Sequence, residues 1–398
     1  EGLINVFNEY NFTDLNEFDF FYAITGNGRP LSKGDLPAFD CPPGQTRQIT
    51  IPENESFAQP GIEYYYNIYA RLRKGSGILP TGYVVASEQF KMPYHPATEM
   101  PRPGGEGDLS VTESEGGILV KGSGFFINFN KRDGTIEGYT FDFKDLILSA
   151  PVPYFWREPT DNDHGFNMNA RLQPWKKASK NRILKRFEVL KAEGSSVELQ
   201  SVYELPDIYS AYTLNYLIDM DGEVTLTGSL HLGDSALPDM PRFGFYMEMH
   251  GGFDKLEWFG RGPFENYVDR KTAAFVGIYG GKVADQHVSY IRPQENGNKC
   301  DVRWMKLSDQ MGTGLQFLAE STFEFTVQHY RPDDIAQENR ETNMHSIDVP
   351  RRNMVGINLD LFQMGVGGND SWGARPIEKY RYPAKDYSFE LKIRPVAK

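Results

Sequence analysis

Several features are scarce in this 398-residue chain, and each absence removes a class of protein. Cys41 and Cys300 are its two cysteines, too far apart for a disulfide framework or a cysteine-based zinc motif. No apolar run approaches the roughly 20 residues that a membrane-spanning helix needs. No charged start followed by an apolar core, the pattern of a signal peptide, is present. We therefore expect no membrane partner.

Positive charge is also in short supply. The chain has 42 Lys and Arg against 54 Asp and Glu, which gives a formal net charge of −12. The basic residues do not form a long tract, so nucleic acid would meet overall repulsion and is not an expected partner. Phosphate-binding glycine loops and Gly-x-Ser-x-Gly elbows are missing. The seven histidines show no metal-ligand spacing, so we expect no metal site in this chain.

Aromatic residues, glycine and proline are plentiful. Aromatics make up 14% of the chain, and there are 39 Gly and 25 Pro. This mixture favours β-sheets joined by many turns. It is also typical of proteins that bind carbohydrate, because flat rings pack against the C–H faces of sugars. Most of the rings are nevertheless expected in the core, where aromatic side chains dominate burial.

Alternation of apolar and polar residues recurs along the chain and predicts strands, for example over residues 63–73, 223–232, 323–327 and 389–393. Asp133-Gly134 and Gly26-Asn27-Gly28 lie between strand-like runs and predict tight hairpin turns. Convincing amphipathic helices are nearly absent. Strands and helices do not alternate regularly, which excludes a βα barrel. We therefore predict an all-β chain.

A Pro- and Gly-rich stretch at residues 93–108 predicts a boundary between two domains. About seven short strands precede it, the number and spacing of an immunoglobulin-like sandwich. The roughly 290 residues that follow contain no comparable break, which favours two broad packed sheets. We predict a small sandwich over residues 1–95, a linker over 96–109 and a large sandwich over 110–398.

Four polar-aromatic clusters are denser than folding alone requires, at residues 155–165, 258–270, 290–297 and 364–372. In the first, Asp161 and Asp163 could bind a cation, although an Asx-turn network is the commoner use of such a pair. The charged residues of the second could form a charge-assisted network. The fourth ends a glycine-rich loop with Trp372. No pair of acidic residues stands in a context that identifies a glycosidase site.

These clusters, in this order, resemble motifs of the small-chain domain of glycoside hydrolase family 2 β-galactosidases. The matches are F-W-R-x-P-x-D-N-D-x-G at 155–165, G-x-G-P-x-E-N-Y-x-D-R at 260–270, P-x-E-N-G at 293–297 and M-G-x-G-G-x-D-S-W at 364–372. The N-terminal part resembles the immunoglobulin-like domain that precedes this one in the family. The resemblance covers essentially the whole chain. With a strand-like start at Leu3, it implies the C-terminal segment of a bacterial β-galactosidase.

The resemblance implies a galactose-mutarotase-like β-supersandwich for the large domain. The catalytic glutamates and the Mg²⁺ site of the family lie in a barrel that would precede residue 1. We therefore expect no catalytic residue, metal or cofactor here, and no activity of the segment alone. The parent would be a bacterial homo-oligomer, cytoplasmic or periplasmic, that hydrolyses terminal β-D-galactosides such as lactose with retention. The implied partners of this segment are the galactoside substrate and the barrel of the same parent chain.

The resemblance also implies roles for particular residues. Trp372 would stack on substrate at the mouth of the barrel, and Asp370 and Asn369 would assist binding. Gly165, Asn167 and Arg171 would belong to a mobile loop. The remaining polar residues of the clusters are predicted to form a structural network: Asp161, Asp163, Glu265, Asn266, Tyr267, Asp269, Arg270, Glu295 and Asn296.

Two alternatives remain open at this point. The chain could act alone as an aldose 1-epimerase-like mutarotase, because the supersandwich fold allows that activity. Such an enzyme needs an acid and a base, for example His and Glu, facing one pocket, and the sequence identifies no such pair. The chain could instead be a stand-alone carbohydrate-binding or structural module.

Overall fold

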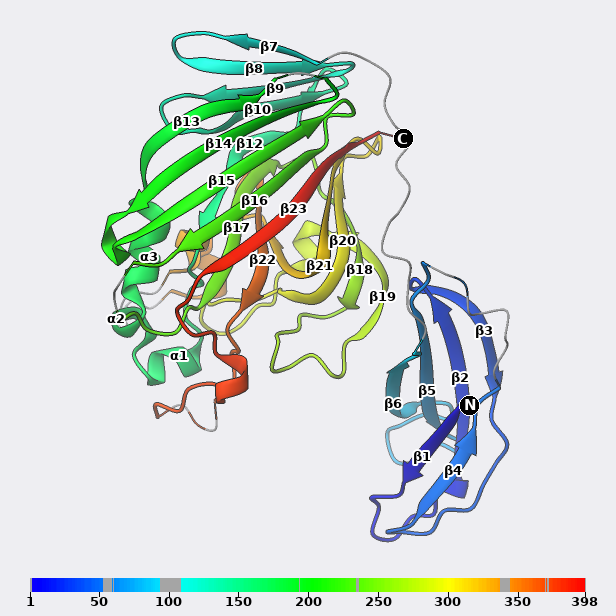
Figure 1. The fold of residues 1–398 in the computed structure, drawn as a ribbon. Coiled ribbons are helices and arrows are strands. Elements are labelled where there is room, and N and C mark those ends of the chain that lie inside the picture. Colours follow the sequence, from blue (N-terminus) through cyan, green and yellow to red (C-terminus); the bar gives the residue numbers. More distant parts are fainter. Residues whose placement is uncertain are drawn as a thin grey trace. The chain divides into compact units, whose positions relative to one another are not determined.

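The chain forms two compact units (Figure 1), described here from a computed structural model. The structure describes residues 2–52, 59, 61–93, 109–192, 194–233, 236–336, 344–368, 370 and 372–397. The first unit comprises Glu1–Arg102 with Phe275–Ile278, and the second Pro103–Ala274 with Tyr279–Lys398. Apart from Leu109, the predicted linker at 96–109 lies outside the described residues.

The first unit is a small antiparallel sandwich. One sheet pairs β1 (Leu3–Phe7) with β4 (Thr46–Thr50), and the other has the order β3 (Arg29–Asp35), β2 (Phe18–Gly26), β5 (Tyr64–Leu72), β6 (Val84–Lys91). Side chains on β2 alternate strictly between buried and half-buried, and the buried set packs with residues of β4 and β5 in one core. This is the predicted immunoglobulin-like architecture, with six strands in the described part rather than about seven.

Both predicted hairpin turns occur. Asn27 and Gly28 connect β2 to β3 with φ angles of 45° and 74°, the left-handed backbone that Asn and Gly adopt most readily. Gly134, at φ 66°, ends the connection between β9 (Phe125–Asn130) and β10 (Thr135–Phe141). That second connection spans residues 131–134, so it is longer than a two-residue turn.

The second unit is built from a five-stranded and a twelve-stranded sheet around one large core (Figure 1). The smaller sheet has the order β11 (Lys144–Asp145), β10, β9, β8 (Gly117–Gly122), β7 (Ser110–Glu113). The larger follows the order β12 (Ile147–Tyr154), β17 (Arg242–His250), β22 (Met354–Gln363), β21 (Gly314–Gln328), β23 (Tyr387–Val396), β16 (Val224–His231), β15 (Ser210–Asp219), β14 (Ser196–Leu205), β13 (Ile183–Lys191). Beside this path, β18 (Lys255–Gly262) pairs with β19 (Phe275–Lys282) and β20 (Lys299–Ser308), and β20 pairs with β21.

Period-two burial explains why many strands of the large sheet form. Every second residue of β16 and β23 is buried, as the sequence alternation predicts. Strands β17 and β22 differ, because almost every residue on them is buried. These strands also carry buried polar side chains, among them Arg242, Asn358 and Asp360. Arg242 and Asn358 line a cavity together with Glu158 and Glu295 of the motif clusters, so these two strands position a buried polar layer.

Three short helices were not expected from the sequence. They are α1 (Asp161–Gly165), α2 (Met168–Arg171) and α3 (Gln173–Lys180), and six short 3₁₀ turns are also described: η1 (Leu15–Glu17), η3 (Pro206–Ile208), η4 (Val283–Gln286), η5 (Pro332–Ile335), η6 (Ser346–Asp348) and η7 (Glu378–Tyr380). Eight residues or fewer are too short to show a convincing 3.6-residue period. No helix of the described ranges has the length and apolar character needed to cross a bilayer.

The segment implied to be a mobile loop has local structure. Gly165 ends α1, Asn167 has a left-handed backbone at φ 60°, and Arg171 ends α2. Phe166 and Met168, between them, are buried. The predicted mobility of these residues stays a prediction.

Candidate functional site

Two of the motif clusters contact the backbone of the fourth. The Arg157 guanidinium donates a hydrogen bond to the Gly365 carbonyl at 3.1 Å, and the Asn162 amide donates to the Val366 carbonyl at 3.3 Å. The Asp269 carboxylate accepts from the amides of Val366 and Gly367 at 3.2 and 2.7 Å. The base of the glycine-rich loop is therefore fixed from two other clusters.

Glycine is required where this loop passes Asp269. A Cβ atom added to Gly365 would lie 2.5 Å from Asp269 Oδ2, well inside van der Waals contact. The close approach of backbone and carboxylate therefore explains the glycine at this position of the motif.

The first cluster is anchored by a buried ion pair. Arg157 and Asp163 are both buried, and Arg157 binds the Asp163 carboxylate through two nitrogens at 2.5 and 3.1 Å. Asp163 also accepts from the Thr160 amide at 2.8 Å in the capping box of α1. The Asp163 carboxylate is thus already bound to Arg157 and to the N-terminus of α1. These contacts favour a structural role over cation binding for the Asp161/Asp163 pair.

Asp161 belongs to a different contact from Asp163. Its backbone amide donates to the Gln294 side-chain oxygen at 3.2 Å, and its carboxylate accepts from the Gln294 side-chain nitrogen at 3.2 Å. This reciprocal pair joins the first cluster to the third. Together with the Asp269 contacts, it brings all four clusters to one place in the second unit.

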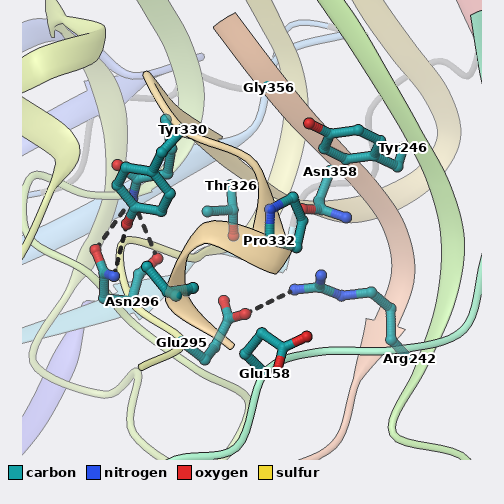
Figure 2. Close-up of a pocket in the computed structure, with 12 residues that line it drawn as sticks. Glu158, Arg242, Tyr246, Glu295, Asn296, Thr326, Tyr330, Pro332, Gly356 and Asn358 are labelled. Carbon is teal, nitrogen blue, oxygen red and sulfur yellow. Dashed lines mark hydrogen bonds and ion pairs between the residues drawn. The ribbon is translucent and has the colours of Figure 1, made fainter. Parts of the chain in front are cut away.

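Arg242 forms ion pairs with two carboxylates, and Figure 2 shows the one with Glu295. Its guanidinium is 3.3 Å from Glu295 and 3.2 Å from Asp360, and all three side chains are buried. Burial raises the pKa of Glu295 and raises that of Asp360 well above its usual value, while Arg242 opposes both shifts. The single guanidinium of Arg242 thus faces two carboxyl groups, those of Glu295 and Asp360.

Glu158 lies near Glu295 and the Arg242 guanidinium (Figure 2) and is also buried. Burial raises the pKa of Glu158 to about 7, against Lys176, whose ammonium is 3.4 Å away. The Trp156 indole N–H donates to the Glu158 carboxylate at 3.0 Å.

Sequence reasoning identified Glu295 but missed Arg242 and Asp360. The sequence did contain a signal for both residues, because each is a charged residue within an apolar strand. Phe243–Phe245 follow Arg242, and Leu359 and Leu361 flank Asp360. A charged side chain in such a strand must be paired if it is buried. Nothing in the sequence could show which partner it has.

The cluster at 258–270 is buried only in part. The Glu265 side chain is 8% exposed, and its carboxylate accepts from the Tyr290 hydroxyl, from the Gly297 amide at 2.8 Å and from Arg270 at 2.7 Å. The Arg270 side chain, however, is 54% exposed. Tyr267 is buried, and its hydroxyl has no hydrogen-bond partner in the described part of the chain. Arg270 is thus exposed but paired, and the structural role of this cluster stays a prediction.

Two asparagines of the predicted network do hold buried backbone in place. Asn266 accepts from the Cys300 amide at 2.8 Å, and Asn296 accepts from the Val288 amide at 3.0 Å. Asn296 also donates to the Tyr330 hydroxyl at 2.8 Å. Buried backbone amides that lie outside a sheet ladder need such partners, so both residues are structural.

The exposure of Arg270 leads to a first prediction. We expect Arg270→Ala to lower the free energy of unfolding by about 1 kcal/mol or less, because a half-exposed ion pair is screened and Glu265 keeps two other hydrogen bonds. Urea denaturation of the variant and the parent chain measures the change. A loss several times larger would show that the pair is desolvated.

The four clusters enclose an open pocket of about 350 Å³. Its lining includes Asp161, Tyr267, Gln294, Glu295 and Gly367, with Arg270 and Tyr290 also contributing. A smaller cavity of about 20 Å³, lined by Glu158, Arg242, Tyr246 and Asn358 among others, shares Glu295 with it (Figure 2). Residues of all four clusters therefore line the open pocket.

Trp372 follows the fixed base of the glycine-rich loop. Its side chain is 91% exposed. Asp370 accepts from the amides of Trp372 and Ala374 at 2.8 and 3.3 Å, so it fixes the turn that carries the ring. Asn369 lies outside the described residues. Substrate binding by these residues stays a prediction.

The acid and base that a mutarotase needs do not share either of two neighbouring pockets. Glu158 and Glu295 line the small cavity, whose described lining contains no histidine. His287 and His329 line a separate pocket of about 200 Å³, whose described lining contains no carboxylate. The geometry therefore gives no support to independent mutarotation.

The fold and the converging loops define an all-β protein whose second unit packs two sheets around one large core. The sequence matches the family described as beta galactosidase small chain over residues 121–393, and beta-galactosidase domain 4 over residues 4–93. The chain belongs to the β-galactosidase small-chain family.

Curated relatives match along the whole chain. A β-galactosidase of Priestia megaterium is 33% identical, and the match covers 100% of this chain and 38% of the relative. A β-galactosidase of Pseudoalteromonas haloplanktis is 28% identical over 98% of this chain and 38% of its own length. One from Streptococcus thermophilus is 27% identical over 100% and 38%. This chain thus spans a little over a third of the length of these relatives.

Solved structures resemble it more distantly. Galactose 1-epimerase from Lactobacillus acidophilus NCFM covers 73% of this chain and 99% of its own, with 8% identity and a TM-score of 0.38. The galactosidase domain of the α-galactosidase-sucrose kinase AgaSK covers 72% and 42%, with 9% identity and a TM-score of 0.40.

Proposed function

We propose that this chain is the non-catalytic C-terminal part of a retaining bacterial β-galactosidase that hydrolyses terminal β-D-galactosides such as lactose. The observation that carries the proposal is the pattern of coverage, since the relatives match the whole chain with only 38% of their own length. The chain would complete the aglycone side of an active site whose catalytic barrel lies elsewhere in the parent.

The geometry of the glycine-rich loop supports this role. Its base is fixed by Arg157, Asn162 and Asp269, while the Trp372 ring at its far end is 91% exposed. A rigid base with an exposed indole suits a side chain that stacks on a sugar held by another domain. Tryptophan offers a large flat apolar surface at little conformational cost.

The remaining partners follow from the same proposal. The parent would be a homo-oligomer, and its Mg²⁺ would be held by the barrel. Across the described residues, no group of three or more His, Cys, Asp or Glu could hold a metal ion, so the fit of a metal to this chain is poor. We assign none to it.

The direct test is hydrolysis of a nitrophenyl β-D-galactoside. We expect the purified chain to show no turnover above background, and the full-length parent to be active. Preparation from a host without its own β-galactosidase is the control. Turnover by the pure chain, or an inactive parent, would contradict the proposal.

Replacing Trp372 tests the stacking role. In the full-length parent, we expect Trp372→Ala to weaken substrate binding by about 1–3 kcal/mol, by analogy with other ring-stacking contacts, which is roughly 5- to 150-fold in the Michaelis constant. Stability should change little, because the ring is exposed. The matched control is Phe143→Ala, which removes a ring that is 93% exposed on the β10–β11 connection. Unchanged kinetics for Trp372→Ala would remove the residue from the site.

A further inference from the structure

We propose that Asp301 is a positioning residue for the loop that carries Trp372, and that it acts by clamping the segment that contains Asp269. Its carboxylate binds both ends of the 261–271 segment, and Asp269 in that segment holds the base of the glycine-rich loop. The inference rests on the proposed function of Trp372 and extends it to a residue outside the four motif clusters.

The Asp301 carboxylate joins two cations from opposite ends of one segment. Its Oδ2 atom is 2.5 Å from Arg261 Nε, and its Oδ1 atom is 2.6 Å from Lys271 Nζ. Burial raises the pKa of Asp301, but hydrogen bonds from Lys271 and Arg261 outweigh that effect and lower the pKa below its usual value. The carboxylate is therefore ionised at neutral pH and holds the two ends of the segment together.

Arg261 extends the clamp to the backbone of the same segment. Its guanidinium also donates to the carbonyl oxygens of Lys271 and Ala274, at 3.0 and 2.8 Å. Lys271 is thus held at its side chain by Asp301 and at its carbonyl by Arg261. Because the Asp301 carboxylate orients both cations, loss of its charge loosens both ends of the segment together.

Asp269 lies two residues before Lys271, inside a tight turn. Tyr267 and Arg270 exchange backbone hydrogen bonds at 3.3 and 2.7 Å, so the turn moves as a unit. Lys271 follows the turn directly, and its anchorage therefore sets the position of the Asp269 carboxylate. That carboxylate holds two backbone amides at the base of the loop that carries Trp372.

The backbone of Asp301 supports a role for its side chain. It has a left-handed conformation at φ 51°, in a part of the β20–β21 pairing where the register shifts. Glycine takes this conformation without strain, and Asn and Asp take it most readily among the other residues. Aspartate therefore suits the backbone and adds a carboxylate that glycine could not supply. A strained residue whose side chain is engaged points to a function for that side chain.

The first measurement is hydrogen exchange of the Val366 and Gly367 amides, followed by NMR in the purified chain. Asp301→Asn keeps a residue that tolerates the left-handed backbone but removes the charge. We expect both amides to exchange about 5-fold faster, the effect of losing one partly exposed ion pair. Asp309→Asn is the matched control, because Asp309 is 21% exposed and pairs with Lys144 at 2.6 Å, outside this segment. Unchanged exchange in Asp301→Asn, or equally faster exchange in the control, would overturn the proposal.

The second measurement is the kinetics of the full-length parent with a nitrophenyl β-D-galactoside. We expect Asp301→Asn to raise KM about 5-fold with little change in kcat, because the substitution weakens binding at the Trp372 ring. In the Trp372→Ala background, Asp301→Asn should cause no further change, since the clamp acts through that ring. A residue that only stabilised the fold would not show this dependence. An equal rise in KM in both backgrounds would contradict the positioning role.

Substitutions of Lys271 keep the test decisive if Asp301→Asn does not fold. Lys271→Met removes the cation but keeps an unbranched side chain, and it should reproduce the faster exchange. Lys271→Arg keeps a cation and should exchange as the parent chain does. The proposal is overturned if Lys271→Met has no effect or if Lys271→Arg matches it. An inactive parent would contradict the proposed function and leave the exchange result intact, so the two proposals fail separately.

Discussion

Arg242→Ala is expected to lower the free energy of unfolding of the chain by about 3–5 kcal/mol. The substitution removes the cation that lies 3.3 Å from Glu295 and 3.2 Å from Asp360, and leaves both carboxylates in a buried layer. An uncompensated buried charge costs far more than the pair is worth. Urea denaturation at neutral pH, followed by circular dichroism, measures the loss.

Two comparisons make the Arg242 experiment specific. Arg186→Ala removes an arginine from an exposed ion pair on β13 and should cost about 1 kcal/mol or less. Combining Arg242→Met with Glu295→Gln and Asp360→Asn removes all three charges and should recover much of the loss, because no charge is then left unpaired. A cost for Arg242→Ala no larger than that for Arg186→Ala would show that water reaches the layer.

Glu324→Gln is expected to change how stability depends on pH. Glu324 is buried on β21, burial raises its pKa to about 7 from 4.5, and its carboxylate accepts from Asn298 at 2.8 Å. Between these pKa values the folded chain holds a proton that the unfolded chain has lost, so this group makes stability fall as pH rises from about 4.5 to 7. Above pH 7 the accumulated loss is about 3 kcal/mol.

The glutamine variant lacks this loss and keeps an acceptor for Asn298. Its stability relative to the parent chain should therefore rise by about 3 kcal/mol between pH 4.5 and pH 7.5. Urea denaturation at several pH values measures the difference, in which the similar contribution of Glu158 cancels. Glu204→Gln, at an exposed position, controls for the change in net charge. Parallel curves for parent and Glu324→Gln would mean that Glu324 is ionised in the fold.

The sequence was informative where structure follows from local pattern. One buried face imposes a period of two, so strands such as β16 and β23 were predictable from alternation alone. Asn27-Gly28 predicted a turn because both residues tolerate a left-handed backbone. Helix α3 was not predicted because its eight residues, with a proline in the first turn, are too few to show a helical period.

The site was predictable in its components but not in its connections. The four motifs marked the loops that meet, yet the contact of Asp269 with the Gly367 amide joins residues 98 positions apart. Arg242 and Glu295 are 53 positions apart and come from a strand and a loop. Such pairs depend on the packing of distant elements, which local patterns do not encode. The outward direction of Arg270 beside the buried Tyr267 depends on one tight turn in the same way.

The placement of the two cysteines has a practical consequence. Cys41 lies in the core of the first unit and Cys300 in the second, and each is 1% exposed. A thiol reacts with an alkylating reagent only when it is accessible and ionised, and burial raises the pKa of Cys300 well above its usual value. Alkylation at each position, read by mass spectrometry of the two peptides, therefore times the opening of each unit independently. The alkylation rates of Cys41 and Cys300 therefore report on the opening of the first and the second unit, respectively.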